Sequence, residues 1–177
     1  MVRCFIGVLI PENLKDNIVK MQQSIKSLPI DCKAVEQENL HICLSFLGEV
    51  NDENLGILCK NLDMVCSEHH SLEVGVSGIK FIPNEKYVRV IVLECISADL
   101  GILSKNIQQN VGGDAKPPHI TLCRVKNIGE NEQTIKKMKE IESCVGMFEI
   151  SSIQLIKSQL EKSGPVYTVL HESKLSN

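Results

Sequence analysis

Two short segments of the chain echo each other, and each places a small polar side chain two residues after a histidine. The first segment pairs His41 with Cys43, and the second pairs His119 with Thr121. Side chains two positions apart on a strand point to the same face, so each histidine lies beside its polar partner. Two imidazoles that face one cavity can act as a metal-free acid and base near neutral pH. The sequence therefore predicts acid–base chemistry at one site shared by the two segments.

The alternation of residue types around the histidines predicts which side chains are buried. In the first segment Ser45 follows His41 and Cys43 on the polar face, whereas Phe46 alternates into the core. In the second segment Cys123 follows on the polar face. The opposite face of both segments is apolar and consists of Leu40, Ile42, Leu44, Ile120 and Leu122. A strand with one apolar face and one face of chemically active residues fits the wall of a binding groove.

Strands and helices alternate along the predicted structure. Apolar residues at helical spacing predict four helices. The first begins at Pro11 and runs to about Leu28, and the second is capped by Asn51 or Asp52 and continues to about Val65. The third is capped by Ser97 or Asp99 and ends at Gly112, and the fourth covers about 130–143. An irregular connection is expected after the first helix, and a turn is expected at Ser163, Gly164 and Pro165. The strands are expected over residues 2–10, 39–47 (ending at Gly48), 72–82, 87–95, 119 onward, 147–157 and 165–171.

The order of these elements repeats along the chain. Residues 11–95 and 97–171 each give a helix, a histidine strand, a helix and two further strands, and His119 follows His41 by roughly half the chain length. No linker or low-complexity stretch separates the two repeats. We therefore expect residues 1–177 to form a single domain of two packed lobes with a cleft between them, where small ligands tend to bind.

Composition narrows the functional class. The formal net charge is −3, whereas proteins that coat duplex nucleic acid are usually basic, so any nucleic acid is expected to be met locally, at an end or a loop. Residues 2–10 lack the basic start and cleavage site of a secretory signal and are too short to span a bilayer. We therefore expect a cytoplasmic protein with no membrane partner. The eight cysteines contain no C-x-x-C pair and mostly lie in apolar segments, as reduced core cysteines do.

The two histidine segments also carry a resemblance to a known family. Residues 41–49 and 118–126 resemble the paired H-x-T motifs of two-histidine phosphoesterases, and they are most similar to the RNA 2′,3′-cyclic phosphodiesterases, historically called 2′-5′ RNA ligases. The resemblance spans essentially the whole chain, because further segments are similar as well. These are residues 3–8, 83–90, 158–160 and 164–167.

This resemblance implies a fold and a reaction. The implied fold is α/β (α+β) and bilobal, a pseudo-twofold duplication in which two mainly antiparallel sheets flank a central groove and the helices lie outside. The implied reaction is hydrolysis of a terminal RNA 2′,3′-cyclic phosphate to a 2′-phosphate, without metal or cofactor, with 2′-5′ ligation as a related activity. The expected partner is RNA with a cyclic phosphate end, such as a tRNA fragment, and the chain is expected to act as a monomer.

The resemblance also implies roles for individual residues. His41 is expected to be the acid and His119 the base, while Thr121 and Arg124 bind the phosphate. Simple alternation places Arg124 on the face opposite His119, so a bulge or a twisted strand end is needed to bring it round. Cys43 occupies the place of the usual Thr or Ser. A thiol is a weaker hydrogen-bond donor, so reduced activity is expected.

Two alternatives remain at this stage. His41, Cys43, His119 and Cys123 are zinc-ligand types, but His119 and Cys123 lie about 13 Å apart on an extended strand, whereas zinc bonds are roughly 2.0–2.3 Å long. A zinc site would therefore use only part of this set. The second alternative is a protein that binds RNA ends or nucleotides in the same groove without turnover. The sequence does not choose among tRNA halves, other RNA ends and small cyclic nucleotides as ligands.

Overall fold

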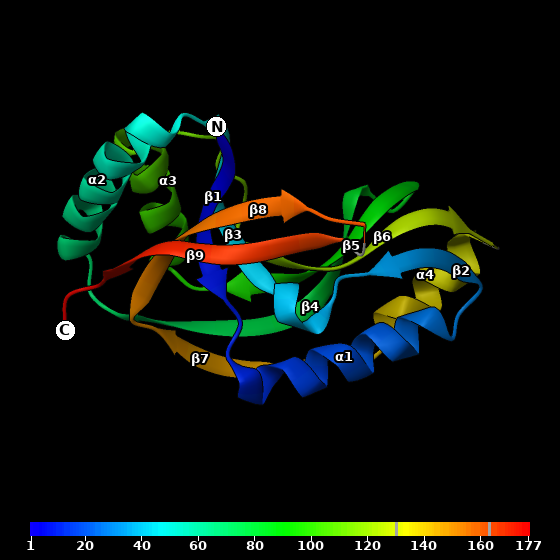
Figure 1. Cartoon of the computed structure of the whole chain (residues 1–177). Helices are drawn as coiled ribbons and strands as arrows, with labels where there is room; N and C mark the ends of the chain where they lie inside the picture. Colours follow the sequence, from blue (N-terminus) through cyan, green and yellow to red (C-terminus); the bar gives the residue numbers. More distant parts are fainter. Residues whose placement is uncertain (130, 163) are drawn as a thin grey trace.

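A curled antiparallel sheet forms the body of the molecule in this computed structural model, which describes residues 1–129, 131–162 and 164–177 (Figure 1). The fold is α+β, with four α-helices and nine strands in the described part of the chain. The strands are β1 (Val2–Leu9), β2 (Ile30–Ala34), β3 (His41–Val50), β4 (Leu72–Asn84), β5 (Tyr87–Ile96), β6 (His119–Ile128), β7 (Gly146–Ile150), β8 (Ser152–Leu160) and β9 (Pro165–Lys174). The helices are α1 (Glu12–Lys26), α2 (Leu55–Ser67), α3 (Leu100–Asn110) and α4 (Asn131–Glu140), with 3-10 turns at Gln37–Asn39 and Asp52–Asn54.

The two histidine strands meet in the middle of the sheet. The strand order is β7-β4-β5-β6-β3-β1-β8-β9, and β2 adds to β6 off this path. A single residue pair, Ile42 with Ile120, joins β3 to β6. Both isoleucines are completely buried, so their apolar faces hold the two halves of the sheet together. The expectation of two separate sheets is therefore corrected to one continuous sheet.

Three expected elements differ in the structure. The connection after α1 contains β2, which pairs with β6. The strand expected over 147–157 is two strands, because β7 pairs with β4 whereas β8 pairs with β1 on the other half of the sheet. The strand β3 does not end at Gly48 but continues to Val50. Gly48 has a φ of 72°, and the pairing of β3 with β1 shifts register beside it. Residue 130 of the fourth expected helix and Ser163 of the expected turn lie outside the described residues.

Buried aliphatic side chains form the core on the faces that the sequence predicted to be apolar. The apolar faces of the two histidine strands and the stripe of α1 that contains Leu14, Ile18 and Ile25 are buried. Figure 1 shows α2 and α3 side by side at one end of the molecule, where α2 contacts β9 and α3 contacts β3, while α1 contacts β2 and β6. Among the described residues, no helix has the length and apolar character that a membrane crossing requires.

Candidate active site

His41 and His119 are held in the same way at the start of their strands. The Nδ1 atom of each ring lies 2.7 Å from a backbone carbonyl oxygen two residues earlier, that of Asn39 for His41 and that of Pro117 for His119. A carbonyl oxygen only accepts hydrogen bonds, so each Nδ1 carries a hydrogen and donates it. The Nε2 atom of each ring is then left as the proton-exchanging atom.

The pairing of β3 with β6 sets the two motifs against each other. The antiparallel pair Ile42–Ile120, continued by one residue in each direction, places His41 opposite Thr121 and Cys43 opposite His119. Each histidine therefore faces the polar residue of the other motif, and all four side chains share one face of the sheet. Their proximity has an electrostatic consequence, because positive charge on His119 helps to lower the pKa of His41.

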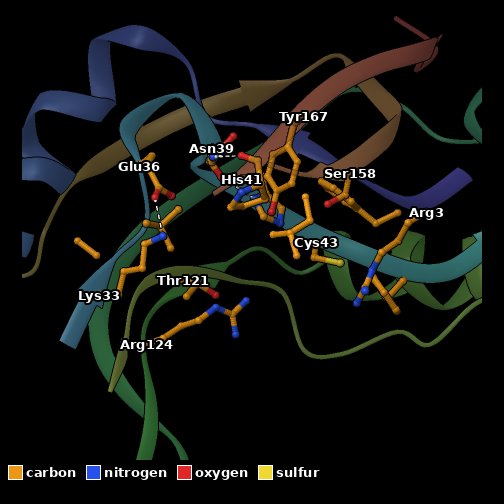
Figure 2. A pocket seen from close by; sticks show the side chains of 16 residues that line it. Arg3, Lys33, Glu36, Asn39, His41, Cys43, Thr121, Arg124, Ser158 and Tyr167 are labelled. Carbon is orange, nitrogen blue, oxygen red and sulfur yellow. Dashed lines mark hydrogen bonds and ion pairs between the residues drawn. The ribbon is translucent and has the colours of Figure 1, made fainter. Parts of the chain in front are cut away.

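A cavity of about 470 Å³ lies over this face. Four of the five predicted site residues line it, namely His41, Cys43, Thr121 and Arg124 (Figure 2). His119 is half-exposed and lies beside the cavity without belonging to its lining. The predicted polar faces of β3 and β6 therefore meet at this cavity, and His119 lies at its margin.

Simple alternation would point Arg124 away from the cavity, but β6 contains a bulge that turns it toward the cavity, as expected from the sequence. Thr121 pairs with Val92 of β5 and Cys123 pairs with Ile91, so Leu122 is an extra residue in β6. The extra residue reverses the alternation, which buries Cys123 and turns Arg124 to the side of Thr121. The position of Arg124 five residues after His119 is thus compatible with a shared face.

A second bulge of the same kind occurs in β3, where alternation alone does not predict it. Gly7 of β1 pairs with Cys43 and Ile6 pairs with Ser45, so Leu44 is the extra residue. Ser45 is consequently buried and donates its hydroxyl hydrogen to the carbonyl oxygen of Gly112 at 2.7 Å. Phe46 is 39% exposed and lines the cavity. The predictions that Ser45 faces the groove and that Phe46 is core are both wrong for this reason.

Aromatic rings enclose His41. Its ring centroid lies 4.7 Å from that of Phe5 and 5.2 Å from that of Tyr167, which meets it edge-on. This burial is the largest cause of the lowered pKa of His41; the hydrogen bond to Asn39 opposes it, and positive charge on His119 and Arg124 adds to it. Burial likewise raises the pKa of Tyr167. The environment of His41 therefore favours its neutral form.

Cys43 is present as a thiol rather than a thiolate. Burial raises its pKa to about 11, and the negative charge of Asp114 acts in the same direction. A protonated thiol is a weak hydrogen-bond donor and a poor nucleophile. Cys43 is therefore suited to contact a bound group weakly and is not poised for covalent catalysis.

Comparison with known proteins shows the family to which the chain belongs. Residues 8–92 match the LigT-like phosphoesterase family. A protein of Methanocaldococcus jannaschii named RNA 2′,3′-cyclic phosphodiesterase is 36% identical over 180 residues, covering 97% of this chain and 99% of the relative. The chain belongs to the RNA 2′,3′-cyclic phosphodiesterase family. It is accordingly an enzyme, a phosphodiester hydrolase.

Further members and solved structures extend this likeness. A protein of the same name from Methanothermobacter thermautotrophicus is 28% identical over 182 residues, covering 98% of this chain and 99% of the relative. A Thermus thermophilus crystal structure superposes with a TM-score of 0.82 at 23% identity, covering 98% of this chain and 97% of the other. E. coli LigT complexed with phosphate gives 0.77 at 20% identity, covering 99% and 98%. The two solved structures share the fold of this cyclic phosphodiesterase family member.

Several residues that line the cavity of this cyclic phosphodiesterase are not among the site residues predicted from the sequence. The guanidinium carbon of Arg3 lies 5.1 Å from the centroid of the Phe46 ring, within the range of a cation–π contact. Asn39 is buried and donates from Nδ2 to the carbonyl oxygen of Pro165 at 2.8 Å, which ties β9 to the segment that holds His41. Lys33 lines the far end of the cavity from a strand that was not predicted. Phe46 follows His41 by five residues, just as Arg124 follows His119. This matching spacing was the sequence signal that Phe46, like Arg124, lines the cavity.

Three further side chains with titratable groups, Lys116, His171 and His69, lie outside the cavity of the cyclic phosphodiesterase. Lys116 pairs with the exposed Asp114 at 2.8 Å. His171 contacts Asp63 at 2.7 Å, and His69 contacts Asn106 at 2.9 Å, both away from the residues that line the cavity. Over the described ranges, no three His, Cys, Asp or Glu side chains gather closely enough to hold a metal ion.

Proposed function

We propose that the enzyme hydrolyses 2′,3′-cyclic phosphate ends of single-stranded RNA and leaves a 2′-phosphate and a 3′-hydroxyl. The observation that carries this proposal is the matched arrangement of His41 and His119, each with Nδ1 committed to a carbonyl oxygen and Nε2 left for proton transfer. Family membership supports the substrate, since the relatives are named for RNA cyclic phosphates. E. coli LigT, which shares the fold, has been crystallised with 3′-AMP and with phosphate.

The proposed reaction is a single in-line displacement at phosphorus. The Nε2 atom of His119 takes a proton from a water molecule as the water oxygen bonds to phosphorus. The bond from phosphorus to the 3′ oxygen breaks, and Nε2 of His41 donates its proton to that oxygen. Replacing the water by the 5′-hydroxyl of a second RNA gives a 2′-5′ linkage by the same steps.

The acid role of His41 requires that substrate binding changes its protonation. Burial lowers the pKa of His41, as do the nearby charges of His119 and Arg124. An anionic phosphate bound between these groups offsets the repulsion and favours the imidazolium. Substrate binding and proton uptake at His41 are therefore coupled in this proposal.

Three groups are placed to stabilise charge on the phosphate. The Thr121 hydroxyl is a strong donor, and the Cys43 thiol is a weak one at the matching position. Arg124 adds a full positive charge from the same cavity wall. The unequal donors predict that phosphate stabilisation is weaker on the Cys43 side than on the Thr121 side.

The end of the cavity that Arg3 and Phe46 form offers a surface for the terminal base. The Phe46 ring faces the cavity and packs against the guanidinium of Arg3. Bases stack on aromatic rings and on guanidinium planes with little sequence preference. This end of the cavity therefore suits a nucleobase of any type.

The decisive experiment is to identify the product end. EDTA-treated protein is incubated with a short RNA that ends in a 2′,3′-cyclic phosphate, and the end is resolved by its sensitivity to phosphatase and by mass and chromatography against 2′- and 3′-phosphate standards. We expect a 2′-phosphate. The variants His41→Asn and His119→Asn keep a donor at the Nδ1 position while removing Nε2, and each is expected to lose about 10²–10⁴-fold in kcat.

Other results would contradict the mechanism. A 3′-phosphate product would mean that the 2′ oxygen leaves instead of the 3′ oxygen. Activity retained in either Asn variant would exclude that histidine as a proton carrier. Activity lost to EDTA and restored by stoichiometric zinc would support a metal site instead. Tight binding of the RNA end by folded protein without any product would favour an RNA-end-binding role.

A further inference from the structure

Lys33 and Arg124 are directly opposite each other on neighbouring strands. They form a register pair between β2 and β6, and both line the cavity. Like charges placed opposite each other on one sheet face destabilise the pairing unless another charge compensates them. Two cations held side by side in a groove therefore require an explanation beyond packing.

The fold holds this cation pair in place. The backbone N–H of Val35, which follows β2, donates to the carbonyl oxygen of Leu122 at 2.9 Å. The buried side chain of Gln22 donates to the carbonyl oxygens of both Val35 and Leu122, at 2.9 and 2.8 Å. Leu122 is the bulge residue that turns Arg124 toward the cavity. The same three contacts thus fix the end of β2 and the orientation of Arg124.

The protein compensates this positive charge only in part. Glu36 lies 3.1 Å from the Nζ atom of Lys33, and the two side chains are 32% and 56% exposed. Such an exposed pair contributes little to stability and is readily exchanged for another anion. Among the ion pairs of the described residues, none involves Arg124, and none involves Arg3 at the other end of the cavity.

The cation pair lies on one side of the histidine site. In Figure 2, Lys33 and Arg3 are at opposite ends of the labelled side chains, and His41, Thr121 and Arg124 lie between them. If the terminal base occupies the Arg3 and Phe46 end, the rest of the RNA strand leaves past Arg124 toward Lys33. The group that follows the terminal nucleoside in that direction is a phosphodiester.

We propose that Lys33, together with Arg124, binds the phosphate on the 5′ side of the terminal nucleotide, so that the enzyme selects oligonucleotides over cyclic mononucleotides. This inference rests on the proposed function and adds to it a binding site for the second phosphate of the RNA. A lysine ammonium is a compact point charge that suits a phosphate oxygen, and Arg124 bridges the two phosphates. Glu36 is displaced when the phosphate arrives.

The test compares adenosine 2′,3′-cyclic phosphate with the dinucleotide ApA carrying the same cyclic end. For the wild-type chain we expect the dinucleotide to have a kcat/KM about tenfold higher, as one charge-assisted contact provides. Lys33→Met is expected to reduce the ratio of the two kcat/KM values to near one. It should also lower the slope of log kcat/KM against log salt for the dinucleotide by about 0.7, the share of one phosphate contact on a single strand.

Lys126→Met is the matched control. Lys126 lies on β6 outside the cavity lining and has its own carboxylate neighbour, Asp31 at 4.0 Å, so its loss changes the net charge equally. The ratio of kcat/KM for the dinucleotide to that for the mononucleotide should be the same in Lys126→Met as in the wild type. Lys33→Met reducing both substrates equally, or a wild-type ratio near one, would overturn the inference.

A binding measurement separates this inference from the proposed function. If the wild-type chain hydrolyses neither substrate, the proposed reaction fails, and the Kd values of the two ligands are compared by calorimetry with and without Lys33→Met. A tenfold preference for the dinucleotide that depends on Lys33 supports the phosphate site in that case. Equal Kd values for the two ligands, or a preference that survives Lys33→Met, overturn it.

Discussion

Ile42 faces Ile120 as the pair that joins β3 to β6, and this register places Cys43 opposite His119 and His41 opposite Thr121. Each motif therefore supplies a donor next to the histidine of the other motif. The two donors are chemically unequal, since one is a hydroxyl and the other a thiol. The consequences of this inequality can be measured.

Cys43→Thr is expected to raise kcat/KM on cyclic-phosphate RNA by about 3–10-fold, the value of one improved neutral hydrogen bond. The thiol of Cys43 has a pKa of about 11 and donates weakly, whereas a threonine hydroxyl donates well. Steady-state kinetics measure the change. Cys144→Thr on the exposed surface is the control and should have no effect. An unchanged or lower rate in Cys43→Thr would show that Cys43 has a role of its own.

Arg124→Met is expected to lower kcat/KM by about 100-fold, because a charged partner of a developing phosphate charge is lost. Arg124→Lys should recover only part of this loss, since a lysine ammonium lacks the planar fork that contacts two oxygens at once. Arg89→Met removes a guanidinium that stacks on Tyr87 outside the cavity and serves as the control. Equal kinetics for Arg124→Met and Arg89→Met would exclude Arg124 from phosphate binding.

Phe46→Leu is expected to raise KM about 5–100-fold with a smaller effect on kcat, because base stacking on an aromatic ring is worth about 1–3 kcal/mol. The exposed ring of Phe46 contacts the ligand before and during the reaction alike, so its loss weakens binding uniformly. Phe148→Leu on β7, outside the cavity lining, is the matched loss of a ring and should leave KM unchanged. A fall in kcat alone would point to a positioning role for Phe46 instead.

Most of the candidate site was predictable from the two histidine motifs, but the directions of the side chains that follow the two bulges were not. Alternation with a period of two correctly gave the buried faces of β3 and β6, and it failed where Leu44 and Leu122 form bulges. The bulge at Leu44 is held by the hydroxyl of Ser104, which donates to its carbonyl oxygen at 2.7 Å. Gln22 holds the bulge at Leu122. Such contacts between residues far apart in sequence leave no local pattern to read.

The strand β2 was missed for a similar reason. Its five residues do alternate between apolar and polar side chains, which was an available signal for a strand, but their partner is β6, about 95 positions later in the chain, and the local sequence does not show that pairing. The sequence around Lys33 therefore gives no sign that this lysine reaches the cavity. Only the assembled sheet places Lys33 opposite Arg124.

Gly7→Ala is expected to destabilise the protein by more than about 2 kcal/mol and to lower activity further than the loss of stability explains. A Cβ atom at Gly7 would overlap the backbone carbonyl oxygen of Ile42, so β1 and β3 must separate next to His41. Thermal unfolding and kinetics of the folded fraction measure the two effects. Gly56→Ala on α2, where a Cβ meets open space, is the control and should be neutral or slightly stabilising. Normal activity in folded Gly7→Ala would show that β3 can move without disturbing His41.

Anion binding is expected to be coupled to proton uptake at His41. Burial lowers the pKa of His41, so the neutral ring predominates at pH values around the ordinary pKa of an imidazole. A bound dianion raises that pKa, and the ring takes up a proton as the anion binds. Affinity therefore falls as the pH rises through this range. Sulfate is the suitable probe, because it does not itself titrate near neutral pH.

Calorimetry of sulfate binding in two buffers with different ionisation enthalpies measures the protons taken up. We expect an uptake of up to about one proton for the wild-type chain, consistent with the linkage between binding and a shifted pKa. His41→Asn should abolish the uptake while keeping the hydrogen bond to the Asn39 carbonyl oxygen. His119→Asn should retain most of it. The reverse pattern, with uptake lost only in His119→Asn, would exchange the acid and base assigned to the two histidines, because the group protonated by the bound anion is the one able to donate to the leaving 3′ oxygen.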